Sequence, residues 1–179
     1  LEEVSKAVKI PVFAQHADSH RVGQFTGSIP LEHLKKIGCT GTLVNHSEKR
    51  ISFSEIRKIV KEAKKLGMKT IVCVQSVAEA KKVASLEPWA VAFEPPYLIG
   101  SKQKSVASEE KKVRQEINAV KKASEKTLFF IGAGLHSEKD FRKSRELGAD
   151  GIMVASAFVE ARNPKNFLEK IVESFILGQ

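Results

Sequence analysis

Short, uninterrupted runs of apolar residues recur along the chain and alternate with longer amphipathic segments. The apolar runs are IPVFAQH, GTLVNH, KTIVCV, WAVAFE, TLFFIG and GIMVAS, at residues 10–16, 41–46, 69–74, 89–94, 127–132 and 151–156. Because their apolar residues are mostly consecutive instead of alternating, these runs are typical of parallel strands that are buried on both faces. The pattern therefore predicts six parallel strands.

The amphipathic segments between these runs predict helices. In the segment before Gly67, apolar residues recur at helical spacing, and the glycine itself is a C-cap signal. Ser76 and Ser137 each precede such a segment and are suited to N-capping. The expected helices cover residues 54–66, 76–86, 111–124, 137–147 and 163–177.

Strict alternation of strand and helix predicts an α/β fold with right-handed crossovers, either an open doubly wound sheet or a closed (βα)8 barrel. A dinucleotide-binding sheet would carry GxGxxG after its first strand, and this sequence does not. Candidate functional residues close several different strands instead, namely His16, His46, Glu94, Gly132 and Ser156. That distribution favours the barrel, in which chemistry is spread over the carboxyl ends of the strands.

Charge and cysteine content narrow the class of protein. The 179 residues include 30 Lys and Arg against 21 Asp and Glu, a formal charge of +9. The lysines recur as scattered pairs with acids between them, and aromatic residues do not interleave with them, so we expect phosphorylated metabolites as partners and not nucleic acid. No apolar run approaches the ~20 residues of a membrane span. Cys39 and Cys73 have neither disulfide-framework nor zinc-site spacing, so we expect a soluble, cytoplasmic protein without a metal.

Residues 93–100, FEPPYLIG, combine an acid, a stiff turn and an apolar loop. Glu94 ends a strand, and partial desolvation there would raise its pKa toward the range of a general base. The prolines at 95–96 restrict the backbone, and the apolar residues 97–99 are predicted to form a lid over a substrate. The lid would end at Gly100, whose backbone N–H can approach an anion. The alternative is a structural acid before a proline turn.

Other strand ends supply further candidates. His46, at the end of LVNH, is expected to lie near a helix N-terminus, which would favour a neutral imidazole that donates a hydrogen bond; the alternative is a structural histidine. Small residues at Gly132, Gly134, Ala155 and Ser156 leave backbone amides accessible to a phosphate group.

Together the motifs FTGSIP, TLVNHSEKR, FEPPYLIG, GAG and VAS resemble the triosephosphate isomerase family in its short archaeal form, and the resemblance covers nearly the whole chain. It implies a TIM barrel that interconverts dihydroxyacetone phosphate and D-glyceraldehyde 3-phosphate through an enediolate, in glycolysis and gluconeogenesis, without a cofactor. By resemblance, His46 polarises the substrate carbonyl, Glu94 moves the proton between C1 and C2, and Glu48 belongs to the surrounding polar network. The residues that would hold the phosphate are Ile99, Gly100, Gly134, Ala155 and Ser156.

The loop GQFTGSIP, residues 23–30, resembles the segment that docks beside a neighbouring active site, so a homo-oligomer, a dimer or a tetramer, is implied. In the family, the first strand carries an asparagine and a catalytic lysine, whereas Lys6 and Lys9 are expected on a helix and its exit. Lys102 and Ala157 stand where relatives usually have glycine. We therefore expect residues 1–179 to be a single incomplete barrel domain with six of the eight βα units and weak or no turnover.

Two other functions remain open at this stage. The first is a non-catalytic phosphate-binding barrel fragment. The second is a different barrel enzyme that acts on a larger sugar phosphate, although the PPYLIG lid favours a small triose.

Overall fold

The centre of the molecule is a six-stranded parallel sheet in which every strand pairs with its neighbours in sequence. The computed structural model describes residues 1–99, 105 and 108–176. The strands are β1 (Phe13–Ala14), β2 (Gly41–Val44), β3 (Lys69–Val74), β4 (Ala90–Phe93), β5 (Leu128–Ile131) and β6 (Gly151–Ile152). This order confirms the predicted run of six parallel βα units.

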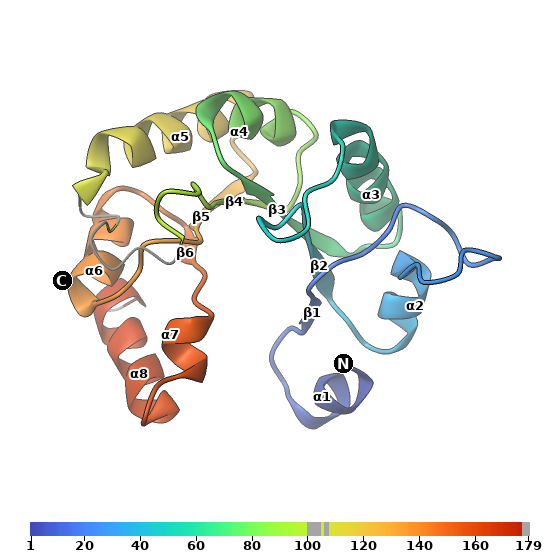
Figure 1. Ribbon diagram of the computed structural model, residues 1–179, viewed down its shortest axis with the longest axis horizontal. Helices are drawn as coiled ribbons and strands as arrows, with labels where there is room; N and C mark the ends of the chain where they lie inside the picture. Colours follow the sequence, from blue (N-terminus) through green and yellow to red (C-terminus); the bar gives the residue numbers. More distant parts are fainter. Residues whose placement is uncertain (100–104, 106–107, 177–179) are drawn as a thin grey trace.

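The helices lie on the outer side of a curled sheet, and β1 and β6 stand at the two ends of the arc (Figure 1). Within the described residues these two strands do not pair, so the barrel is open between them. The helices are α1 (Glu2–Ala7), α2 (Leu31–Lys36), α3 (Phe53–Lys65), α4 (Val77–Ala84), α5 (Glu110–Ala123), α6 (Glu138–Glu146), α7 (Ser156–Val159) and α8 (Pro164–Ile171), which continues into a π-helical turn, Val172–Ile176. The sequence pattern did not predict α2 and α7.

Helix α3 illustrates why these segments become helical. Its first backbone amides are capped by Ser52, whose Oγ accepts a hydrogen bond from the Glu55 N–H at 3.2 Å. A stripe that includes Ile56 and Ile59 is buried against the sheet, and each such side chain contributes roughly 1.5–3 kcal/mol. Gly67, at φ 67°, ends the helix in the left-handed region as predicted.

Two apolar layers lie on the two faces of the sheet, and β4 contributes to both. Val91 and Phe93 belong to the outer core against the helices, whereas Ala90 and Ala92 belong to an inner cluster inside the arc. Because side chains of a strand alternate between faces, the next inward position is Glu94. The alternation of β4 therefore directs this carboxylate into the barrel.

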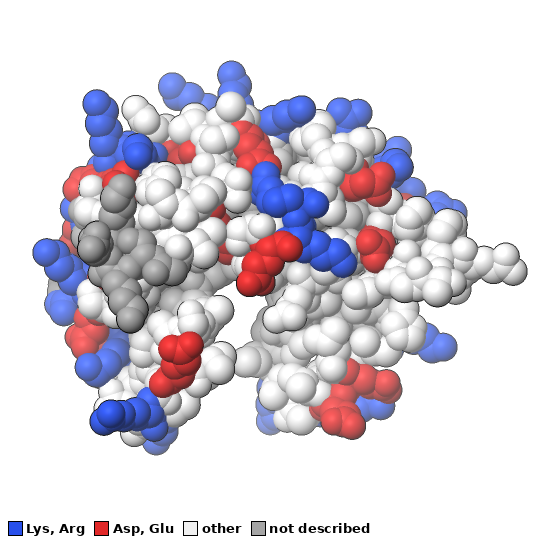
Figure 2. All heavy atoms as spheres, viewed as in Figure 1, with Lys and Arg blue, Asp and Glu red and all other residues white. Residues whose placement is uncertain are grey.

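Charged side chains do not gather into one patch on the face seen in Figure 2. Lys and Arg lie mainly around the outline of the molecule, with Asp and Glu among them, and a hollow opens in the lower part of this view. In the part of the chain that the structure describes, no helix is long and apolar enough to cross a membrane.

Candidate active site

A cavity of about 310 Å³ lies at the carboxyl ends of β2, β4, β5 and β6. The structure brings together in its lining every described residue that the family resemblance predicted for the site: His46, Glu48, Glu94, Ile99, Gly134, Ala155 and Ser156. Gly100 lies outside the described residues. Ligands of parallel α/β folds bind at this end of the strands.

The imidazole of His46 faces the carboxylate of Glu94 across the cavity. The distance from His46 Nε2 to Glu94 Oε2 is 3.6 Å. On the other side of the ring, Nδ1 accepts a hydrogen bond from the Glu48 N–H at 3.3 Å. In this contact Nδ1 is the acceptor, so a neutral ring would carry its proton on Nε2, on the side of Glu94.

The expectation that a helix N-terminus keeps His46 neutral is wrong. Helix α3 begins at Phe53, and His46 lies before a turn in which the Lys49 N–H donates to the His46 carbonyl at 2.9 Å. The backbone N–H of Glu48 in this turn replaces the helix as the partner of the ring. The Glu48 side chain is 88% exposed, and its Oε2 lies 3.6 Å from the same Nδ1.

Glu94 is the buried acid of the cavity. Its exposed fraction is 3%, and burial raises its pKa above the ordinary value of 4.5. Hydrogen bonds from the Cys73 thiol and the Ser47 backbone and the charge of Arg50 act in the opposite direction and limit this rise, as would a protonated His46. Within the described part of the chain, Glu94 Oε2 has no hydrogen-bond partner.

Cys73 is a neighbour of the site that the sequence analysis did not single out. Burial, and then the nearby Glu94 carboxylate, raise the pKa of its thiol, so the sulfur stays protonated and acts as a donor to Glu94. Its place follows from register, since Cys73 pairs with Ala92 on β4, one inward position before Glu94. The two-residue period of the strand KTIVCV is the feature of the sequence from which the inward position of Cys73 could have been predicted.

The predicted lid is split between two environments. Leu98 is 1% exposed and Ile99 is 45% exposed, and both line the cavity. Leu98 is held by a turn in which its N–H donates to the Pro95 carbonyl at 2.9 Å. Tyr97 is not among the lining residues and lies instead under Lys112 of α5, whose Nζ is 4.3 Å from the ring centroid.

Small residues form another part of the cavity lining. Gly134 has a φ of 73°, and Ala155 is the N-cap of the short helix α7, which begins at Ser156. Amides in the first turn of a helix have no partner within it. Gly132 lies so close to Glu94 that a Cβ there would stand 2.6 Å from Glu94 Cγ.

The described lining of this cavity carries no basic side chain except the imidazoles of His46 and His136. Among the described residues that line it there is no lysine or arginine. Lys6 lies on α1, where its Nζ pairs with Glu2 at 2.7 Å on the surface. Ala157 lines the cavity, and Lys102 lies outside the described residues.

A second, wider hollow of about 740 Å³ adjoins the first and shares His46 and Glu94 with it. It extends along the interior of the arc to His16 on the β1 side. His16 is paired with Asp18, with 3.1 Å between Nε2 and Oδ1, and Asp18 also accepts from the Ile29 N–H at 2.7 Å. This strand-end histidine therefore supports the loop after β1.

Sequence comparison agrees with this geometry. The family model for triosephosphate isomerase matches residues 1–175. The triosephosphate isomerase of Methanocaldococcus jannaschii is 36% identical over 97% of this chain and 79% of its own length. Those of Methanothermus fervidus and Sulfurisphaera tokodaii are each 40% identical, over 96% and 98% of this chain and 78% and 75% of their own lengths. The chain belongs to the triosephosphate isomerase family.

Proposed function

We propose that this chain performs proton transfer between dihydroxyacetone phosphate and D-glyceraldehyde 3-phosphate, with Glu94 as the base and His46 as the electrophile. The observation that carries this proposal is the pair itself. A buried carboxylate and a neutral imidazole lie 3.6 Å apart in a cavity of about 310 Å³, which is small enough for a triose phosphate.

The reaction can be followed atom by atom. Glu94 takes a proton from C1 of dihydroxyacetone phosphate, and the electron pair of that C–H bond moves toward the C2 carbonyl. His46 Nε2–H donates to the oxygen on which negative charge develops, which stabilises the enediolate. His46 gives its Nε2 proton to the C2 oxygen and takes up the proton of the C1 hydroxyl, and return of the carbon-bound proton from Glu94 to C2 then gives the aldehyde at C1. The pair alone moves the proton, so the step calls for no cofactor.

Burial makes Glu94 a stronger base than an exposed carboxylate. Its raised pKa places the proton affinity closer to neutral pH, where a general base is most effective. Leu98 and Ile99 cover this side of the cavity with apolar surface and reduce the access of water.

The phosphate group is proposed to bind at the end of the cavity lined by Ile99, Gly134, Ala155 and Ser156; Gly100, the remaining predicted residue, lies outside the described residues. Support comes from the small residues of this end and from the first-turn amides of α7. Because no lysine or arginine faces the described part of the cavity, we expect weak phosphate binding and slow turnover from residues 1–179 alone.

The partners and setting of this activity are further parts of the proposal. The substrate is a small phosphorylated triose of glycolysis and gluconeogenesis, the active form is a homo-oligomer, and neither nucleic acid nor membrane takes part. The cytoplasm is the proposed compartment, supported by two cysteines, Cys39 and Cys73, that are both free thiols.

Deuterium exchange tests the base directly and remains sensitive when net turnover is slow. Dihydroxyacetone phosphate is incubated with the protein in D₂O, and loss of the C1 proton signal is followed by NMR. We expect exchange above the buffer background in the wild type and a fall of at least about 10²-fold in Glu94→Gln, because the amide is not a base. His46→Gln should slow exchange without removing the base.

The matched control is Glu110→Gln on α5, whose carboxylate pairs with Arg114 and Lys143 and does not line the cavity. Its exchange rate should stay within a few-fold of the wild type. Equal exchange in the wild type and in Glu94→Gln would contradict the proposal. If inorganic phosphate still bound both proteins, a non-catalytic phosphate-binding role would replace it.

A further inference from the structure

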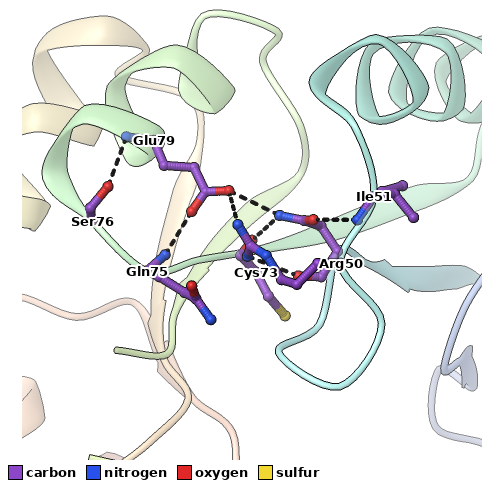
Figure 3. A network of polar contacts seen from close by, with 7 residues as sticks. Arg50, Ile51, Cys73, Gln75, Ser76 and Glu79 are labelled. Atoms are coloured by element: carbon purple, nitrogen blue, oxygen red, sulfur yellow. Dashed lines mark hydrogen bonds and ion pairs between the residues drawn. The ribbon is translucent and has the colours of Figure 1, made fainter. Parts of the chain in front are cut away.

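Behind the cavity, Glu79 of α4 links the end of β2 to the end of β3 (Figure 3). One of its oxygens, Oε1, accepts from Asn45 Nδ2 at 3.1 Å and from a guanidinium nitrogen of Arg50. The other, Oε2, accepts from the Gln75 N–H at 2.9 Å. The Glu79 backbone N–H is itself capped by Ser76 Oγ at 3.3 Å. One carboxylate therefore binds two loops at once.

Asn45 is the residue through which this network reaches the imidazole. It is fully buried and has a φ of 64°, a left-handed conformation that few residues other than glycine adopt. Its Oδ1 accepts from the Ile51 N–H at 3.0 Å, and its Nδ2 donates to the Cys73 carbonyl at 2.9 Å. The left-handed residue interrupts the alternation of β2, and the next residue, His46, enters the cavity.

Arg50 extends the network toward the carboxylate. Its Nη1 donates to the Asn45 carbonyl at 3.2 Å and to the Cys73 carbonyl at 3.5 Å. The thiol of Cys73 contacts Glu94. The positive charge of the Arg50 guanidinium also lowers the pKa of Glu94. Asn45, which precedes His46, and Cys73, whose thiol donates to Glu94, are therefore held by the same set of side chains.

Capping of α4 alone does not explain this arrangement. A cap requires only the Ser76 hydroxyl, which accepts from the Glu79 N–H. The additional contacts with Asn45 and Arg50 come from a separate element, the segment between β2 and α3. They fix the backbone on which His46 stands.

We propose that Glu79 is a positioning residue for the His46–Glu94 pair. Glu79 acts through Asn45 and Arg50 and does not touch the substrate. This inference rests on the proposed function, because it names the support of the same site. A displacement of about 1 Å in such a pair is enough to slow a reaction by up to ~10²-fold.

The test compares Glu79→Ala, Glu79→Gln and Arg50→Ala with the wild type. Deuterium exchange into dihydroxyacetone phosphate gives the rate at saturation, the apparent KM and the pH profile. For Glu79→Ala we expect the rate to fall about 10- to 100-fold with little change in KM. The acid limb should move to higher pH, because Arg50 is no longer fixed where it lowers the pKa of Glu94.

Arg50→Ala leaves the α4 cap intact, so it separates positioning from capping. It should reproduce the slower exchange with a smaller loss of thermal stability than Glu79→Ala. Glu79→Gln keeps a carbonyl acceptor and should give an intermediate rate, and it serves as the test variant if Glu79→Ala does not fold. The matched control is Glu110→Gln, which removes an ion-paired carboxylate of α5 far from this network.

NMR of the His46 ring nitrogens provides a readout that does not depend on turnover. In the wild type and in Glu110→Gln we expect one neutral tautomer with the proton on Nε2, and in the Glu79 variants a mixture of tautomers. An absence of exchange in the wild type would count against the proposed function, and the ring signals would still decide this inference. A lower melting temperature with unchanged tautomer, rate and acid limb would overturn it.

Discussion

At the scale of single residues, the sequence was sufficient to single out the proposed reacting groups, Glu94 and His46, and insufficient to predict the contacts that hold them. Glu94 and His46 could be predicted because each closes an apolar run, and strand ends converge in a parallel α/β fold. The tautomer of His46 depends on a hydrogen bond from one backbone N–H, and the direction of its ring depends on the left-handed backbone of Asn45. Both features arise from the conformation of a turn, which the pattern of apolar residues does not encode.

A residue-scale prediction concerns Glu116 of α5, an acid buried outside the cavity. Its exposed fraction is 2%, and burial, followed by the charge of Glu79, raises its pKa from 4.5 to about 7. The folded protein therefore holds this proton more tightly than the unfolded chain, and stability falls as pH rises from about 4.5 to about 7. Glu116→Gln should be more stable than the wild type above that range, by up to roughly 3 kcal/mol.

Urea unfolding at several pH values checks this expectation. The two proteins should converge below the ordinary carboxylate pKa and separate toward alkaline pH. Glu110→Gln on the same helix provides the contrast, because ion pairs with Lys143 and Arg114 lower the pKa of Glu110. That change should weaken the fold at neutral pH. A constant difference for Glu116→Gln across the whole pH range would show that no proton is involved.

At the scale of elements, the number and order of the strands could be predicted, and their ends could not. The runs of apolar residues located all six strands, but β1 and β6 form only two-residue ladders because each has a partner on one side alone. The helices α2 and α7 are too short for a sustained apolar period. The loop after β4 was interpreted as one lid, although Tyr97 and Ile99 face different surroundings.

An element-scale prediction compares two glycines at neighbouring strand ends. In Gly132→Ala the new Cβ would stand 2.8 Å from Glu94 Oε1, and in Gly151→Ala it would stand 2.7 Å from the Phe130 ring. The first should displace a movable carboxylate and reduce deuterium exchange about 10-fold or more with a small change in melting temperature. The second should overpack the inner layer, at a cost of about 1–3 kcal/mol of stability.

Thermal unfolding and exchange measured on both variants give the comparison. Similar losses of rate and similar losses of stability in the two proteins would mean that Gly132 serves packing and not the placement of Glu94.

At the scale of the whole molecule, the arc of six βα units places the site between its two free ends. The sequence predicted these six βα units. The edges at β1 and β6 are open because these two strands do not pair with each other in the described chain. The interior of the arc therefore holds two adjoining hollows, the cavity of about 310 Å³ and the wider one of about 740 Å³. Surface charge contributes little to this organisation, since the lysines are dispersed (Figure 2).

A whole-molecule prediction concerns the loop between β1 and α2, which projects from the body in Figure 1. Its base is tied by Asp18, and its apolar residues Val22, Phe25 and Ile29 are 72%, 47% and 38% exposed. Exposed apolar residues on a projecting loop are typical of a subunit contact. We expect Phe25→Asp to shift the protein from an oligomer toward the monomer in sedimentation velocity.

Ile10→Asp, which changes an apolar residue that is 73% exposed but lies outside the loop, is the control and should sediment as the wild type does. A monomeric wild type, or an unchanged oligomer in Phe25→Asp, would remove the loop from the interface.

Because the side chains of β4 alternate between the two faces of the sheet, the face on which Glu94 lies depends on the number of residues that precede it in the strand. Val91 and Phe93 belong to the helix-covered core, and Ala90 and Ala92 to the inner cluster. Deleting one residue between them would turn the acid outward among apolar helices and place the Phe93 side chain in the inner layer. A substitution along this strand changes the size of one side chain, whereas a change of length by one residue inverts the two faces.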